Sequence, residues 1–86
     1  MPNLGDLIKS GQIQIGDQLE WIRPRQGIRH NAEITAHGTI TTSDGVKHKT
    51  PSGAAKHLNG GKPVDGWLAW KVKDSGESLA SLRDSK

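Results

Sequence analysis

The feature that most constrains the fold is a strictly alternating segment, IRHNAEITA, from Ile28 to Ala36. Every second residue belongs to a mostly apolar row, and the residues between them are all polar: Arg29, Asn31, Glu33 and Thr35. A period of two residues is typical of a β-strand that packs one face on a core. We therefore predict a sheet with one packed face and one face open to solvent or to a partner.

Turn signals on both sides predict that this strand has antiparallel neighbours in a meander. Gly38 leads into TITTS, and Asp44-Gly45 is a strong hairpin signal before VKHKT. On the N-terminal side, IGDQLEWIR ends at Pro24, where PRQG forms a turn. Segment 66–72, GWLAWKV, is also predicted as a strand, with Leu68, Trp70 and Val72 on one face and Trp67, Ala69 and Lys71 on the other.

Short helices are predicted near both ends and in the middle of the chain. Asn3 can cap the first, and the second begins at Thr50-Pro51, because proline fits a position whose N–H has no helical partner. Leu79 and Leu82 mark a closing helix. The prediction is one domain, 1–86, of the α+β class: a small antiparallel sheet of about four to five strands with short helices packed against it.

Composition excludes several classes of protein. The chain has no cysteine, so disulfides and thiolate zinc sites are excluded, which fits a reducing, cytoplasmic location. No apolar run approaches the ~20 residues that cross a bilayer, and we expect no signal peptide. The four histidines lack metal-ligand spacing, and no nucleophile or carboxylate motif is present. We therefore expect no membrane, metal, cofactor or catalytic function.

Charge is distributed unevenly along the chain. From Trp21 to Lys62 there are seven basic and two acidic side chains, a net charge of +5, and all four histidines lie in this segment. The remainder has five basic and seven acidic side chains, a net charge of −2. A basic middle between acidic ends suggests a polyanionic partner, and an unevenly charged soluble surface is the alternative.

Two local features are candidates for ligand contacts. The start of the Thr50 helix offers backbone N–H groups, the Ser52 hydroxyl and, one turn on, Lys56, an arrangement that resembles a phosphate grip. An ordinary capped helix explains the same residues. Trp67 can stack a base or cover a second small apolar cluster, whereas Trp70 and Trp21 are predicted in the core.

Three stretches together resemble one known family, the RAMA domain. They are LIKSGQIQIGDQL, RPRQGIRHNAEITAHGTI and DGVKHKTPSGAAKHLNGGKPVDGWLAWKV, which follow the family's order and cover Leu7 to Val72. The succession TPSGAA, a spacer and DGWLAW is the most specific part, with Asp65 where the family usually has Asn. The resemblance implies a DNA-binding module without catalysis of its own, associated with restriction–modification proteins and proposed to sense adenine methylation.

Residues and resemblance together predict a non-catalytic module that binds double-stranded DNA, with adenine methylation as a candidate signal. Two alternatives stay open: a protein-interaction module that docks on a restriction or methylation complex, and a single-stranded nucleic acid binder. The predicted DNA-binding residues are Arg23, Arg25, Arg29, Lys47, Lys49, Ser52, Lys56 and Trp67. The three arginines, Lys47 and Lys49 are expected to form one surface, because they belong to or feed the polar rows of one sheet.

Overall fold

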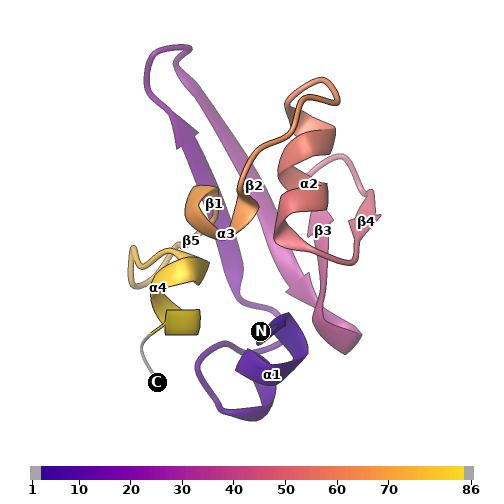
Figure 1. The fold of residues 1–86 in the computed structure, drawn as a ribbon, viewed down its shortest axis with the longest axis vertical. Coiled ribbons are helices and arrows are strands. Elements are labelled where there is room, and N and C mark those ends of the chain that lie inside the picture. Colours follow the sequence, from indigo (N-terminus) through magenta and orange to yellow (C-terminus); the bar gives the residue numbers. More distant parts are fainter. Residues whose placement is uncertain (1–2, 85–86) are drawn as a thin grey trace.

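The computed structural model describes residues 3–84 and has an α+β fold, as the sequence predicts (Figure 1). An antiparallel sheet of five strands is accompanied by four short helices and a 3-10 turn in these residues. The strands are β1 (Gln18–Arg23), β2 (Ile28–Thr35), β3 (Thr39–Thr42), β4 (Lys47–His48) and β5 (Lys71–Val72). The helices are α1 (Leu4–Lys9), α2 (Pro51–Leu58), α3 (Gly66–Ala69) and α4 (Leu79–Asp84), and the 3-10 turn η1 spans Ala36–Gly38.

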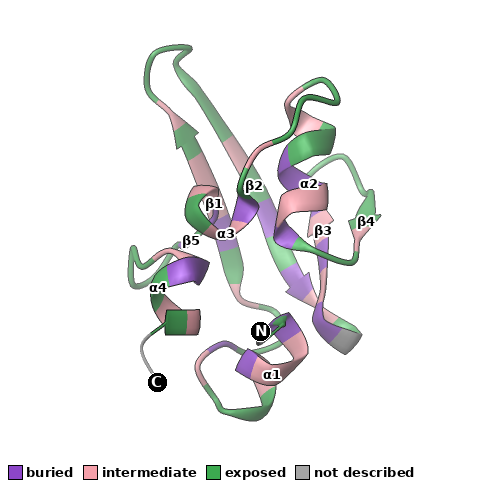
Figure 2. Cartoon of the chain, viewed as in Figure 1, coloured by how far each residue is buried: buried purple, intermediate pink, exposed green. Residues whose placement is uncertain are grey.

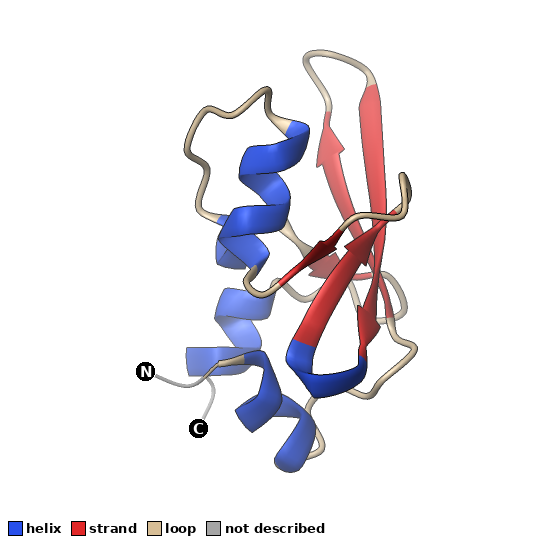
Figure 3. Cartoon of the chain, turned by 90° about the vertical axis from the view of Figure 1, so that its right-hand side faces the viewer, coloured by secondary structure: helices blue, strands red, loops and turns tan. Residues whose placement is uncertain are grey.

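The sheet is a meander extended by one returning strand. Its order is β4-β3-β2-β1-β5, and every neighbouring pair is antiparallel. The helices lie on one side of the sheet, and the other side is left uncovered (Figure 3). This matches the prediction of one packed and one open face, because the alternation of β2 has a core on only one side.

The packed face and the helices enclose one hydrophobic core (Figure 2). Trp70 is fully buried at its centre, and the edge of its indole meets Trp21, with ring centroids 6.0 Å apart. The other core side chains are Leu4, Leu7, Ile13, Leu19, Ala32, Ile34, Ile40, Ala54, Val72 and Leu79. No helix in residues 3–84 is long and apolar enough to cross a membrane.

The predicted helix starts are present in the structure. Asn3 and Asp6 form a reciprocal capping box at α1, each side chain accepting from the other's backbone N–H. Thr50 Oγ1 accepts from the Gly53 N–H at 3.0 Å, and Pro51 occupies the first turn of α2. These local signals need no tertiary support, so the sequence alone was enough to find them.

The strand predicted over 66–72 is wrong for its first half. Residues 66–69 form α3, only Lys71 and Val72 are in a strand, and Leu68 is 62% exposed instead of sharing the core with Trp70. A helix cap and a long-range hydrogen bond explain why this segment is a helix and not a strand. Asp65 Oδ1 accepts from the Trp67 N–H at 3.1 Å, and the Trp70 indole N–H donates to the Pro51 carbonyl at 3.2 Å.

Candidate nucleic-acid interface

The turn between β1 and β2 carries three of the predicted DNA-binding residues. Arg23 ends β1, Arg25 lies in the turn and Arg29 follows the first residue of β2. Backbone hydrogen bonds close the turn, and Gly27 has φ +65°, a conformation that glycine adopts without strain. Arg25 and Arg29 are exposed, and Arg29 Nε lies 3.8 Å from Glu20 Oε2. We call residues 21–30 the β1–β2 ribbon.

The expectation of one surface for all five basic residues is wrong for Arg23. Arg23 is opposite Ile28 in the register and therefore points to the helix-bearing side, where its guanidinium lies 5.0 Å from the Trp21 ring centroid. Arg29 is opposite Ile22 and points to the open side. Side chains alternate between the two faces along a strand, so Arg23 lies on the same face as Trp21, which packs on the core.

Three lysines lie on β4, on α2 and on the segment between them. Lys47 lies in β4 opposite Thr41, and Thr41 lies opposite Glu33 of β2. Cross-strand partners share a face, so Lys47 is on the open face with Glu33. Lys49 lies between β4 and α2, and Lys56 is on α2. All three side chains are exposed. Arg29 and Lys47 thus share a face but are separated along the sheet, since Arg29 lies four residues from Glu33 in β2.

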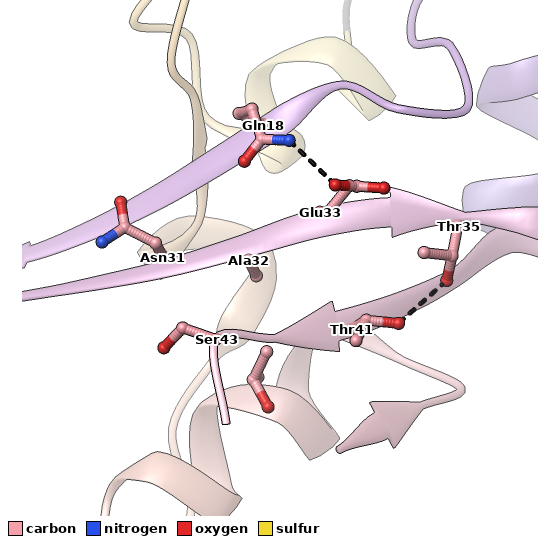
Figure 4. Close-up of a pocket in the computed structure, with 8 residues that line it drawn as sticks. Gln18, Asn31, Ala32, Glu33, Thr35, Thr41 and Ser43 are labelled. Atoms are coloured by element: carbon pink, nitrogen blue, oxygen red, sulfur yellow. Dashed lines mark hydrogen bonds between the residues drawn. The ribbon is translucent and has the colours of Figure 1, made fainter. Parts of the chain in front are cut away.

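A polar depression of about 220 Å³ lies between these two basic groups on the open face (Figure 4). Gln18 Nε2 donates to Glu33 Oε1 at 3.0 Å, and the Thr35 and Thr41 hydroxyls are 3.2 Å apart. Glu33 is one of only two acidic residues in segment 21–62. The lining of the depression includes the acidic residue Glu33 and neither Arg29 nor Lys47, so the two basic groups lie beside the depression and not within it.

The other acidic residue of the segment, Asp44, is held inside a network that sequence reasoning missed. Its carboxylate accepts from the Thr42 hydroxyl and lies 2.7 Å from His57 Nε2. Hydrogen bonds from Thr42 and His57 lower the pKa of Asp44 to about 2. The His57 ring lies 4.9 Å from that of His48. Asp44 was interpreted as a hairpin residue only, and contact with residue 57 gives no local sequence signal.

The Nε2 atoms of His30 and His48 are buried without a hydrogen-bond partner within the part of the chain described. Burial lowers the pKa of His48, and the nearby His57 lowers it further. Burial also lowers the pKa of His30, with a smaller contribution from the Arg23 charge. No group of three or more metal-ligating side chains comes together among the side chains that the structure describes, and that of His37 is not one of them.

The phosphate grip predicted at the start of α2 is largely occupied by the protein itself. Thr50 Oγ1 takes the Gly53 N–H, and Ser52 Oγ accepts from the Gly66 N–H at 3.1 Å. Gly66 packs so closely on the first turn that a Cβ there would overlap the Pro51 carbonyl. Ser52 is half-buried. The ordinary capped helix, the alternative weighed for these residues, explains the hydrogen bonds of Thr50 and Ser52, and contact of Ser52 and Lys56 with a phosphate stays a prediction.

Trp67 is placed against α4 instead of on an open strand face. Its indole is half-buried and packs on the core, and the Arg83 guanidinium lies 5.0 Å from the ring centroid. The ring thus packs at the edge of the one hydrophobic core and not on the second apolar cluster that the sequence suggested. No contact in the structure tests the base stacking expected of Trp67, and the Arg83 guanidinium lies over one face of the ring.

The basic segment and the helices α1 and α4 occupy different parts of the fold. The β1–β2 ribbon, β4 and α2 carry the basic segment and form the upper and right-hand parts of Figure 1, whereas α1 and α4 lie at the bottom. The acidic residues outside the basic segment are Asp6, Asp17, Glu20, Asp65, Asp74, Glu77 and Asp84. The two carboxylates within it already have side-chain partners. α1 and α4 each carry one acidic and one basic residue, and Glu20 lies in β1 beside Arg29, so the acidic residues are not gathered at one end of the fold.

Comparison with known proteins agrees with the resemblance seen in the sequence. A family model described as Restriction Enzyme Adenine Methylase Associated, RAMA, matches residues 2–85, essentially the whole chain. No curated protein sequence gives a significant match. In the structure, the matching succession TPSGAA and DGWLAW forms the junction between α2 and α3, where Asp65 caps α3 as an asparagine would.

Proposed function

Because the chain belongs to the RAMA family, which is associated with the adenine methylases of restriction–modification systems, we propose that it is a non-catalytic, cytoplasmic module that binds double-stranded DNA. Adenine methylation is the signal to which its binding responds. The family description supports the link to restriction–modification, and the arrangement of charge supports DNA as the ligand. Proteins of restriction or methylation complexes are its proposed protein partners.

The observation that carries the proposal is the exposure of basic side chains on two parts of the fold. Lys47, Lys49 and Lys56 surround one unit of the fold, Arg25 and Arg29 project from another, and all five are exposed. Exposed lysine and arginine neutralise phosphates and release the counterions condensed on DNA. α1 and α4 carry no net charge and lie away from the tip of the ribbon (Figure 1), so they do not oppose this contact.

The proposal assigns no reaction to the chain. Among residues 3–84, the pair of His57 with Asp44 is the arrangement most similar to a catalytic one. To complete it, a nucleophile would have to donate a hydrogen bond to the imidazole. The Thr42 hydroxyl donates to Asp44 and to the Val46 carbonyl instead. This network ties the β3–β4 turn to α2, which is a structural role.

Titration of a labelled duplex at several salt concentrations tests the proposal. We expect micromolar affinity at low salt, and log K should fall against log salt with a slope of ~0.9 for each phosphate neutralised. Lys49→Ala should reduce the affinity for all sequences alike and lower the slope by ~1, because a phosphate contact carries no sequence information. Lys73→Ala is the matched control, since Lys73 is an exposed lysine after β5. Binding that ignores salt, or no binding at low salt, would contradict the proposal.

The same assay separates the remaining alternatives. Duplex with and without N6-methyladenine tests the methylation response, since that amino group lies in the major groove. A single-stranded oligonucleotide of the same length tests the alternative of single-strand binding. Tighter binding to the single strand than to either duplex would replace duplex recognition with single-strand binding. Equal affinity for methylated and unmethylated duplex would leave DNA binding and remove the methylation response.

A second candidate function, docking on a protein of a restriction or methylation complex, has its own supporting observation. Ile15 is 59% exposed beside a shallow depression of about 330 Å³ lined also by Gly5, Ile8, Lys9 and Gly38. Exposed apolar surface of this kind marks interaction sites. Ile15→Ser should weaken co-purification with a methylase partner and leave the DNA affinity unchanged. Loss of both together would contradict a separate docking surface.

A further inference from the structure

The β1–β2 ribbon extends beyond the rest of the sheet as an isolated pair of strands. The edge strand β5 pairs only with Leu19 and Glu20 of β1, and β3 pairs only with residues 32–35 of β2. Residues 21–23 and 28–30 therefore pair with one another and with no third strand. Figure 1 shows this ribbon projecting at one end of the molecule. At about 3.3 Å per residue, the three pairs reach about 10 Å, before the turn is counted.

The base of the ribbon is anchored, so its projection is a stable feature. Trp21 packs on buried Trp70, and His30 lies against Trp21 with ring centroids 5.0 Å apart. Arg23 lies over the same indole at 5.0 Å. These contacts fix the ribbon on the core while the turn beyond Arg23 stays exposed. A rigid element costs little ordering entropy when it binds.

Each face of the ribbon presents one arginine beside one exposed isoleucine. The register places Ile22 opposite Arg29 on the open face, and Arg23 opposite Ile28 on the other. Ile22 is 48% and Ile28 40% exposed. Arg25 stands at the tip and makes no ion pair within residues 3–84. Ile22 and Ile28 thus offer apolar surface directly beside the arginines at the end of the ribbon.

These dimensions and side chains match the major groove of DNA. The groove is about 12 Å wide and about 8.5 Å deep, and it admits a two-stranded ribbon. Arginine reads guanine O6 and N7 there with two hydrogen bonds, and apolar side chains contact the methyl groups that project into the groove. The Arg29 side chain is 62% exposed and its contact with Glu20 is long at 3.8 Å, so this ion pair competes weakly with a base contact.

We propose that the β1–β2 ribbon enters the major groove and reads bases through Arg25 and Arg29, with Ile22 and Ile28 contacting methyl groups. The inference rests on the proposed function, duplex DNA binding, and adds the element that distinguishes sequences. Lys47, Lys49 and Lys56 then hold the backbone. Within this arrangement the ribbon sets specificity, and the lysines set affinity that is independent of sequence.

Selection of duplexes from a random pool by the full chain, followed by chemical probing, tests the inference. We expect enrichment of a guanine-containing motif and protection of guanine N7 from dimethyl sulfate. Arg25→Ala with Arg29→Ala should remove that protection and lower the affinity for the selected duplex ~10- to 100-fold. The conservative double variant, Arg25→Lys with Arg29→Lys, keeps the charge. It should keep most of the salt slope and lose the preference for the selected duplex.

Several outcomes would overturn the inference, and they differ from those that overturn the proposed function. If the wild-type chain binds duplex but enriches no motif, or if guanine N7 stays reactive, the ribbon does not read bases. The same holds if the lysine double variant keeps the wild-type preference. If the wild-type chain binds no duplex at all, the proposed function fails together with the inference. Circular dichroism of each variant confirms that the exposed substitutions leave the fold intact, and Lys71→Ala with Lys73→Ala removes the same two charges from exposed lysines elsewhere.

Discussion

The α2–α3 junction and the tip of the β1–β2 ribbon are built by opposite means. At the junction, Pro51, Ser52, Gly66 and Trp70 meet through two long-range hydrogen bonds and a contact that leaves no room for a Cβ. At the tip, residues 24–29 are all exposed, and their backbone bonds only within the turn and across the ribbon. One region stabilises the fold, and the other displays side chains.

The difference teaches where to look for function in this family. The succession TPSGAA and DGWLAW, the most specific part of the resemblance, is explained by folding, because its hydroxyls, glycine and indole all bond or pack within the protein. The exposed arginines and lysines lie outside it or at its edge. A strong motif therefore identifies the architecture, and the candidate contacts with DNA lie on segments that carry little motif of their own.

The largest expected effect is at the junction. Trp70→Ala should lower the free energy of unfolding by ~3–5 kcal/mol, because the indole is fully buried and its N–H bonds to Pro51. That is a large share of the stability of a domain of this size. Trp67→Ala should cost less, since Trp67 is half-buried. Thermal or urea unfolding of both variants measures the difference.

DNA titration of the same two variants sharpens the result. Trp67→Ala should leave the affinity unchanged once the protein is folded, because its ring packs beneath α4 and Arg83. Equal melting temperatures for the two variants would mean that both indoles contribute equally to the core. A folded Trp67→Ala protein with weaker DNA binding would restore base stacking as the role of this residue.

A pair of glycine substitutions compares the two regions directly. Gly66→Ala should cost ~3 kcal/mol, the upper end of overpacking effects, because the new Cβ overlaps the Pro51 carbonyl and neighbouring backbone. Gly27→Ala in the ribbon turn meets no other atom and should cost only ~1 kcal/mol, from its left-handed backbone. Urea unfolding of both proteins measures the two costs. A larger effect at Gly27 than at Gly66 would reverse the assignment of roles.

Much of the fold could be predicted because its signals are local. Alternation in β2, the turns at Gly27 and Gly45, and the caps at Asn3 and Thr50 each lie within a few residues of the element that they define. The α+β class and the antiparallel meander follow from these signals. The helix α3 did not follow, because Trp67, Leu68 and Trp70 read as an alternating strand until the bond from Trp70 to Pro51 is known.

The candidate site was predicted in outline and not in its arrangement. Charge counting located the basic segment, but the side of the sheet on which Arg23 lies depends on the row it shares with core Trp21. The role of Ser52 depends on Gly66, fourteen residues away in sequence. The Asp44–His57 contact spans thirteen residues and two elements. Such contacts leave no periodic pattern, so a single sequence cannot reveal them.

The smallest expected effect is on pH dependence, and it separates the two regions once more. The arginines of the tip stay charged at every accessible pH, whereas α2 is tied to the sheet by groups that titrate. Burial lowers the pKa of His48 below its ordinary value of 6.5, so the unfolded chain binds more protons than the folded one as pH falls through 6.5. The same holds for His30. Stability should therefore be constant above pH 7.5 and decrease below 6.5.

Asp44 adds a second step at lower pH, with its sign fixed by the opposite logic. Its pKa is lowered from 3.8 to about 2, so its contribution to stability is complete above pH 4 and is lost between 3.8 and about 2. Thermal melts at constant ionic strength measure both steps. His48→Gln should reduce the first step and leave the second, and Asp44→Asn should abolish the second, because neither amide titrates. Equal melting temperatures of the wild-type chain at pH 8 and pH 5 would show that the buried imidazoles accept protons in the fold at no cost, against the burial seen at their Nε2 atoms.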